Sequence, residues 1–284
     1  MLLCKFKASD GNIGIGCLDG EEVRVLGMAA DGGPGLSDIL HADSPGDRVQ
    51  QILRQTDIRA PKGDLVLLPP IDLQEVWGAG VTYHRSREAR ESESAGAARF
   101  YNLVYSAPRP ELFFKAMPYR VMGPGGPLHV RNDSRWTVPE PELALVISPR
   151  MQIVGFTIGN DMSARDIEGE NPLYLPQAKT YRGSCALGPV IALPEAMPPR
   201  PEIAIQLTIE RCDRQVFHGE TSVSRMHRTF EELIDWLGRE SDFPTGVILL
   251  TGTGIVPPDD FSLEPGDRVH INISGIGCLT NEVR

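Results

Sequence analysis

The sequence has 284 residues, of which 41% are hydrophobic and 23% are charged, so it is typical of a folded globular protein and argues against a disordered, fibrous or solenoid chain. Its formal net charge is −10, and no basic run interleaves with aromatic residues, which argues against binding to nucleic acid or to an anionic membrane. Five widely spaced cysteines without a CxxC pair argue against a disulfide framework or a zinc knuckle, and they fit a reducing compartment.

The amino-terminal part predicts a small β domain. A charge at Lys5 interrupts the first residues before any long apolar stretch, so we expect no signal peptide, no membrane span and a cytoplasmic location. Short strands are expected over residues 2–8, 13–18 and 22–26, with Gly and Asp turns between them. A stretch rich in Gly, Asp, Ser and Pro follows, and we place a domain boundary near residue 70, giving domains 1–70 and 71–284.

The segment 84–99 is crowded with charge and has almost no apolar face. Composition alone favours a solvated surface helix there, with a mobile lid as the alternative.

Beyond residue 110 the pattern predicts a mainly β roll or sandwich. Strands are expected over residues 143–147, 153–158, 190–193, 204–209, 247–250 and 268–273. One amphipathic helix is expected to interrupt them, because Phe230, Leu233 and Leu237 repeat at helical spacing behind a capping box from Thr229 to Glu232.

Three acidic residues are expected to converge at one end of a hairpin. Glu140 and Glu142 are two apart before an apolar strand, so their side chains share a face about 6.6 Å apart along a strand. Asp161 follows the next predicted strand, and a turn near residues 149–150 would bring it to the same end. Three carboxylates at one point repel each other unless a cation neutralises them, and an oxygen-only set suits Mg²⁺ better than zinc. Spacing alone, however, favours the simpler reading that these charges keep an edge strand soluble.

Other residues carry weaker expectations. Lys179 follows a stretch with two prolines that predicts an exposed loop, although a lysine beside a desolvated cationic site could act as a general base. Arg165 and Asp166 could orient a substrate carboxylate or form a local ion pair. Cys185 is expected to be a small buried residue and His84 a surface group.

Two motifs together resemble the core of the fumarylacetoacetate hydrolase superfamily: WTVPEPELALV at residues 136–146 and GFTIGNDMSARD at residues 155–166. PGD at residues 265–267 and GIGCLTN at residues 275–281 are also similar to that family, so the resemblance covers about residues 70 to 284. It implies a mainly β (α+β) fold, a mixed β-sandwich roll with a small amino-terminal β domain, assembled as a homodimer or homotetramer. It also implies that Glu140, Glu142 and Asp161 hold Mg²⁺, with Ca²⁺ or Mn²⁺ as alternatives, and that Lys179 is the active-site lysine.

Within the superfamily, the segments 167–179 and 184–189 look most similar to 2-keto-3-deoxy-pentonate dehydratases, of the D-arabinonate or D-xylonate series. Hydrolases and acylpyruvases of the family usually carry Asn-Tyr-x-x-His with a water-activating His and Glu. This chain has Thr82-Tyr83-His84 there, with Glu88 further on, so its histidine is one position short.

The resemblance therefore implies dehydration of a small 2-oxo acid to 2,5-dioxopentanoate. Lys179 is the candidate base at C3, and Glu111 the candidate acid that expels the C4 hydroxyl. Substrate binding is expected from Arg85, Arg87, Arg165, Ser184 and Thr253.

Four alternatives stay open on the sequence. The same metal chelate could serve hydrolysis of a carbon–carbon bond in an acylpyruvate or diketo acid, or decarboxylation of oxaloacetate. Lys179 could instead form a Schiff base without a metal. A binding or structural role without catalysis is the fourth, and the intact set of carboxylates argues against it.

Overall fold

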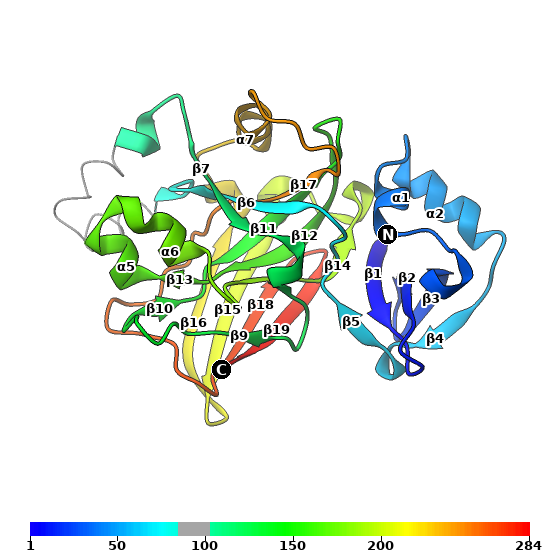
Figure 1. Ribbon diagram of the computed structural model, residues 1–284, viewed down its shortest axis with the longest axis horizontal. Coiled ribbons are helices and arrows are strands. Elements are labelled where there is room, and N and C mark those ends of the chain that lie inside the picture. The colour runs from blue at the N-terminus through cyan, green and yellow to red at the C-terminus, as the bar shows by residue number, and fades with distance from the viewer. Residues whose placement is uncertain (85–102) are drawn as a thin grey trace.

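The computed structural model describes residues 1–84 and 103–284, and it contains two main β-sheets (Figure 1). The larger sheet has twelve strands. They are β1 Leu2–Lys7, β2 Ile13–Asp19, β3 Glu22–Met28, β4 Arg59–Pro61, β5 Val66–Leu68, β6 Glu75–Gly80, β7 Glu111–Ala116, β8 Val121–Met122, β11 Pro141–Ile147, β12 Ile153–Asp161, β14 Cys185–Ala192 and β17 Val247–Leu250.

The second sheet has five strands in the order β16-β15-β18-β19-β9. They are β9 Pro127–Leu128, β15 Ala204–Arg211, β16 Arg214–Ser222, β18 Arg268–Ile273 and β19 Gly277–Val283, and a separate pair is formed by β10 Thr137–Val138 and β13 Ser163–Ala164. The described helices are α1 Leu36–Leu40, α2 Pro45–Leu53, α5 Arg165–Glu170, α6 Leu175–Lys179 and α7 Phe230–Leu237. None of them is both long and apolar enough to cross a membrane.

The core lies between the two sheets. Alternation along β11 sends Leu143, Leu145 and Ile147 into one cluster with the apolar residues of β15 and β18. The residues between them, Ala144 and Val146, belong to a second cluster on the other face of the large sheet. Because Glu142 follows the same alternation as Ala144, it too lies on that other face.

The predicted hairpin of β11 and β12 is confirmed. The strands pair in antiparallel register, with Pro141 opposite Asn160 and Glu142 opposite Gly159. At the turn, the backbone N–H of Ser148 donates to the carbonyl of Gln152 at 2.9 Å. The hairpin is central in the large sheet, with β14 beside β12 and β17 beside β11. This position holds in place the end of the hairpin that carries Glu142 and Asp161.

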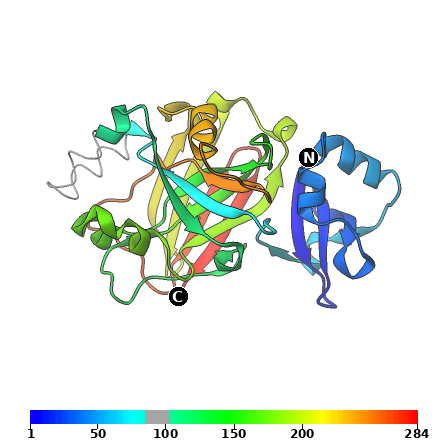
Figure 2. The ribbon, with the colours of Figure 1, turned by 45° about the horizontal axis from the view of Figure 1, so that its top comes forward.

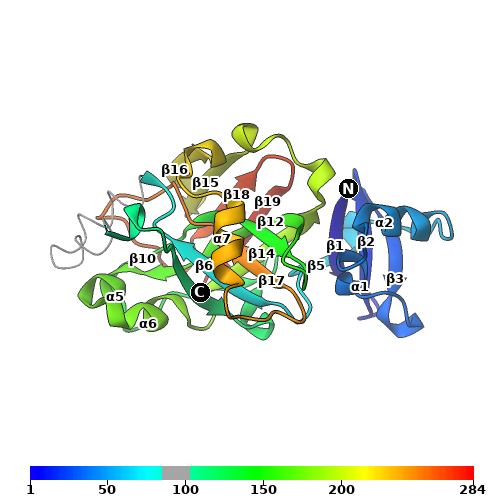
Figure 3. The same ribbon diagram turned by 90° about the horizontal axis from the view of Figure 1, so that it is seen from above.

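The amino-terminal β element is present and lies at one end of the molecule in all three views (Figures 1, 2 and 3). Its strand β1 continues the large sheet, since Leu2 pairs with Ala192 and Leu3 with Ile191 of β14. The turn-rich stretch holds α1 and the start of α2, which the sequence analysis missed. Ser44 caps α2 by accepting the N–H of Asp47, and a proline in the first turn fits a helix start. The boundary near residue 70 stays a prediction.

The predicted helix with its capping residue is α7, which lies across the large sheet (Figure 3). The hydroxyl of Thr229 accepts the N–H of Glu232 at 3.1 Å, and Phe230, Leu233 and Leu237 are buried. This apolar face holds the helix to the sheet.

Replacement of Leu145 by alanine should lower the free energy of unfolding by about 2–5 kcal/mol, because the fully buried side chain lies between the two sheets. Urea denaturation measures this loss. Leu173→Ala is the matched control: that leucine is 83% exposed, so its removal should change stability by no more than about 0.5 kcal/mol. Equal losses in the two variants would contradict the packing described here.

Candidate metal and active site

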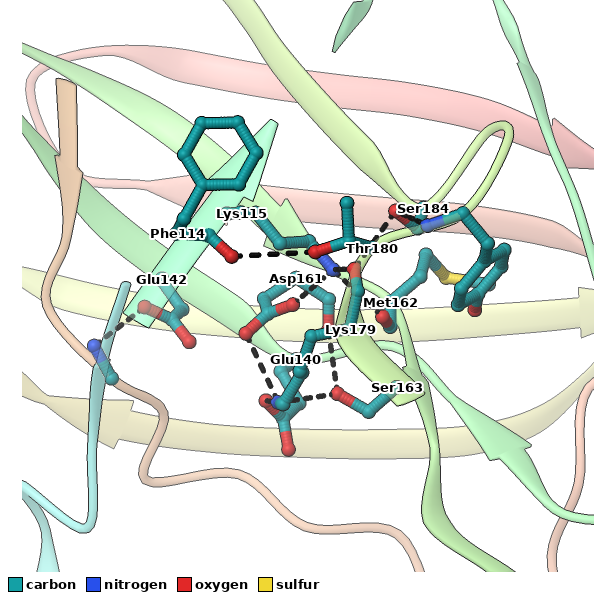
Figure 4. A network of polar contacts seen from close by, with 12 residues as sticks. Phe114, Lys115, Glu140, Glu142, Asp161, Met162, Ser163, Lys179, Thr180 and Ser184 are labelled. Carbon is teal, nitrogen blue, oxygen red and sulfur yellow. Dashed lines mark hydrogen bonds and ion pairs between the residues drawn. The ribbon is translucent and has the colours of Figure 1, made fainter. Parts of the chain in front are cut away.

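Three buried carboxylates meet at one end of the β11–β12 hairpin (Figure 4). Glu140 precedes β11, Glu142 lies in it, and Asp161 ends β12. One oxygen from each lies within 4.8 Å of the other two. The backbone N–H of Asp161 donates to the carbonyl of Glu140 at 3.0 Å, so the main chain itself sets their spacing. The predicted convergence is confirmed.

Lys179 brings a positive charge between two of these carboxylates. Its Nζ lies 2.5 Å from Oε2 of Glu140, 3.0 Å from Oδ2 of Asp161 and 2.6 Å from the hydroxyl of Ser163. The side chain is 2% exposed. A buried ammonium is costly unless it is paired in this way.

The sequence expectation of an exposed loop at Lys179 is wrong. Lys179 is the last residue of the short helix α6, and α5 and a 3₁₀ turn, Pro172–Tyr174, precede it. Both prolines of this stretch lie in the first turn of a helical segment, where a missing N–H costs nothing. The prolines thus begin helical turns instead of ending them. Lys179 is buried because its ammonium pairs with the carboxylates of Glu140 and Asp161.

Two further cationic side chains pair with Glu140 and Asp161. Arg165 is buried, and its Nη2 donates to Oε1 of Glu140 at 2.6 Å. Lys115 of β7 is fully buried and forms an ion pair with Oδ1 of Asp161. Three carboxylates therefore face three cationic side chains within a region closed to solvent.

Lys115 is the site residue that sequence reasoning missed. A signal was present, because Glu111, Phe113 and Lys115 alternate along one strand and therefore share a face. The glutamate of this row lies against Gly80: a Cβ added at Gly80 would come 2.1 Å from Oε2 of Glu111. A Cβ at this position would therefore displace the glutamate carboxylate from where it now lies.

Glu142 is held in an unusual protonation environment. Burial raises the pKa of its carboxyl well above 4.5, and the charges of Asp161 and Glu140 raise it further, against the opposing effects of Lys179 and of the Gly252 N–H. That N–H donates to Oε2 of Glu142 at 2.5 Å. Gly252 has a φ of 91°, and a Cβ there would lie 2.0 Å from the hydroxyl of Thr82, so the position requires glycine.

The donor set fits a hard divalent cation. All three ligands offered are carboxylate oxygens, which suit Mg²⁺, Ca²⁺ or Mn²⁺, whereas zinc sites usually include His or Cys. The raised pKa of Glu142 supports the same reading, because a nearby cation would offset the burial and the like charges that raise it.

The cavity beside the carboxylates is small, about 10 Å³. That is room for one ion or water, so a substrate requires movement of a lining group. Val81 lines the cavity with a φ of 52°, a strained conformation for a β-branched residue. The other lining residues are Ala79, Gly80, Phe113, Glu140, Glu142, Asp161, Lys179, Gly252 and Thr253.

Of the predicted substrate-binding residues, Thr253 lines this cavity. Ser184 is buried instead beside the end of α6, where its hydroxyl donates to the carbonyl of Lys179 at 3.0 Å. Arg165 contacts Glu140, as described above. Arg85 and Arg87, like Glu88 and most of the predicted charged helix, lie outside the described residues.

Cys185 and His84 behave as expected from the sequence. Cys185 is 1% exposed, and burial raises the pKa of its thiol to about 12, so it is a core residue. His84 is exposed, with its ring against that of Tyr105.

Mg²⁺ affinity should fall as the pH falls, because the cation needs Glu142 ionised and the raised pKa favours the protonated carboxyl in the metal-free protein. Below the raised pKa we expect a loss approaching about tenfold per pH unit and the release of about one proton on binding. Calorimetric titration in buffers of different protonation enthalpy counts that proton. By the same linkage, the metal-free protein should lose stability as the pH rises from 4.5 through the raised pKa, since the folded state binds the proton more tightly.

The control for this titration is Glu282→Gln on exposed surface, which should keep the affinity and its pH dependence. Glu142→Gln should weaken binding and abolish the proton release. A wild-type affinity that does not change with pH, with no proton released, would contradict this assignment.

Comparison with known proteins agrees with the geometry. Residues 75–284 match the family described as "Fumarylacetoacetate (FAA) hydrolase C-terminal". Probable 2-keto-3-deoxyxylonate dehydratase of Haloferax volcanii is 48% identical over 214 residues, 75% of this chain and 73% of that one. 2-Dehydro-3-deoxy-D-arabinonate dehydratase of Saccharolobus solfataricus is 45% identical over 243 residues, 84% of this chain and 82% of that one.

A solved structure gives the same result over the full length. It is described as 2-keto-3-deoxy-D-arabinonate dehydratase complexed with magnesium and 2,5-dioxopentanoate, and it is 37% identical, with a TM-score of 0.84 over 100% of this chain and 99% of that one. Its likeness confirms the expected mainly β fold. The chain belongs to the fumarylacetoacetate hydrolase superfamily.

Proposed function

We propose that this protein is a magnesium-dependent dehydratase that converts a 2-keto-3-deoxy-pentonate, of the D-arabinonate or D-xylonate series, into 2,5-dioxopentanoate. The observation that carries the proposal is the buried oxygen-only cluster of Glu140, Glu142 and Asp161 with Lys179 against it. Further support is the full-length likeness to a dehydratase complexed with magnesium and 2,5-dioxopentanoate.

The three carboxylates would hold the cation, and Lys179 would move the first proton. When bound, magnesium would supply a Lewis acid beside the carboxylate and 2-oxo group of the substrate. The Lewis acid would make the C3 proton of the substrate more acidic. Lys179 Nζ, already among these carboxylates, is our candidate to take that proton; it must first lose a proton of its own, which the charge of a bound cation would favour.

Glu111 is our candidate acid. Its carboxyl would give a proton to the C4 hydroxyl, so that water leaves as the bond between C3 and C4 becomes double. Proton shifts then convert the C5 alcohol of this unsaturated 2-oxo acid into the aldehyde of 2,5-dioxopentanoate. Support comes from the close approach of Glu111 to Gly80, which lines the same cavity as Phe113 and Lys179.

Substrate recognition is assigned more broadly. Thr253 is favoured because it lines the cavity, and Arg85 and Arg87 are proposed because they lie in the charged segment 84–99. Arg165 donates to Glu140, and Ser184 donates to the Lys179 carbonyl. These contacts support a role in positioning Glu140 and Lys179 as well as the proposed contact with substrate. A cytoplasmic homodimer or homotetramer is part of the proposal.

Turnover distinguishes the candidate activities. Purified protein with Mg²⁺ should convert 2-keto-3-deoxy-D-arabinonate or its D-xylonate counterpart into 2,5-dioxopentanoate, and a chelator should stop the reaction because the carboxylates alone provide no Lewis acid. Pyruvate from acetylpyruvate alone would favour the hydrolase and direct attention to His84 and Glu88. Pyruvate from oxaloacetate alone would favour the decarboxylase.

Lys179→Met should lower kcat by about 100- to 10,000-fold, the usual contribution of a general base. Mg²⁺ affinity, measured by calorimetry, should not fall, because the substitution removes a positive charge from between Glu140 and Asp161. Lys7→Met, on exposed surface, should leave both quantities unchanged. Wild-type turnover in Lys179→Met would refute the base, and borohydride trapping of wild type with substrate in the presence of chelator would favour the Schiff base.

A further inference from the structure

The ammonium of Lys115 contacts three oxygens from two neighbouring segments (Figure 4). It pairs with Oδ1 of Asp161, donates to the carbonyl of Met162 at 2.9 Å, and donates to the carbonyl of Lys179. Two of its N–H groups therefore donate to main-chain carbonyls, and its charge is paired with the carboxylate of Asp161. Lys115 lies in β7, and its side chain is fully buried, which leaves it little freedom to move.

These contacts join a carboxylate of the metal site to the main chain of Lys179. Lys179 ends α6, and the last carbonyls of a helix have no partner within it. The Lys179 carbonyl is held by Lys115 and by Ser184, so the main chain that carries the candidate base is anchored at its carbonyl.

Asp161 is held from two sides. Its Oδ2 faces the Nζ of Lys179, while its Oδ1 faces Lys115. A ligand carboxylate that is fixed through one oxygen presents the other in a defined direction, and such outer contacts tune metal sites.

We propose that Lys115 is a positioning residue: its ammonium orients the Asp161 carboxylate for the cation and fixes the end of α6 that carries Lys179. Its effect on turnover rests on the proposed function. Its effect on cation affinity depends only on the carboxylate cluster, so the positioning role of Lys115 and the proposed dehydratase function can be refuted separately.

Charge neutralisation is the competing explanation, and it predicts the opposite sign. If Lys115 only balanced the charge of Asp161, its removal would make the site more negative and Mg²⁺ would bind more tightly. If Lys115 positions Asp161, its removal weakens Mg²⁺ binding despite the lost repulsion.

The test is Lys115→Met, with Lys5→Met as the matched control. Lys5 also pairs with an aspartate, at 2.7 Å from Oδ1 of Asp72, and donates to a carbonyl, at 2.8 Å from that of Ile71, but it lies in the amino-terminal element. Calorimetry gives the Mg²⁺ affinity, steady-state kinetics at saturating Mg²⁺ gives kcat and KM, and thermal unfolding gives Tm.

Lys115→Met should weaken Mg²⁺ binding by about 10- to 100-fold, and at saturating Mg²⁺ it should still lower kcat with little change in KM. Lys5→Met should lower Tm and leave Mg²⁺ affinity and kcat unchanged. Mg²⁺ binding by Lys115→Met as tight as in wild type, or tighter, overturns the proposal.

Ser184→Ala covers the case in which Lys115→Met does not fold. It removes the second donor to the Lys179 carbonyl without touching Asp161, so kcat should fall several-fold while KM and Mg²⁺ affinity stay unchanged. An unchanged kcat, or a rise in KM alone, overturns the anchoring of α6. A wild-type protein without dehydratase turnover, but with weakened Mg²⁺ binding in Lys115→Met, would refute the proposed function and leave the role of Lys115 intact.

Discussion

Burial of three like charges at one point is the constraint on which the site depends. Glu140, Glu142 and Asp161 are all nearly closed to water, and an unpaired carboxylate in such a place would cost several kcal/mol. Lys115, Lys179 and Arg165 offset this cost through direct ion pairs with Glu140 and Asp161. Glu142 accepts a hydrogen bond from the backbone N–H of Gly252, but the pKa of its carboxyl remains raised. The network is thus balanced at two carboxylates and incomplete at the third, where a cation has most to contribute.

The fold supplies this network from elements that are rigid. The β11–β12 hairpin lies in the middle of the large sheet, with one face packed against the second sheet, so the carboxylates at its end have little freedom. The cations come from its surroundings: Lys115 from β7, Arg165 from the start of α5 and Lys179 from the end of α6. Preorganisation of this kind lets charged groups act on a substrate without first rearranging solvent. Because the cavity is small and Lys179 lies between Glu140 and Asp161, we expect its ammonium to move when the cation and the substrate enter.

Local patterns in the sequence predict the hairpin, the acidic cluster and α7, because each depends on residues near one another in the chain. The alternation around Glu142 and the cap at Thr229 are examples. Burial of Lys179 could not be predicted in this way, since it depends on carboxylates 18 and 39 residues away. Lys115 was harder still, because its partners lie 46 to 64 residues away: the alternation along its strand gives the face on which it lies but not those partners. For Lys179, only resemblance to a family supplied what periodicity could not.

A crystal structure of the protein soaked with Mg²⁺ tests the central claim most directly. The account predicts the cation among the oxygens of Glu140, Glu142 and Asp161, with the Lys179 ammonium moved from its place between two of them and Lys115 still on Asp161. A cation bound elsewhere, or Lys179 unmoved between Glu140 and Asp161 at saturating Mg²⁺, would contradict it.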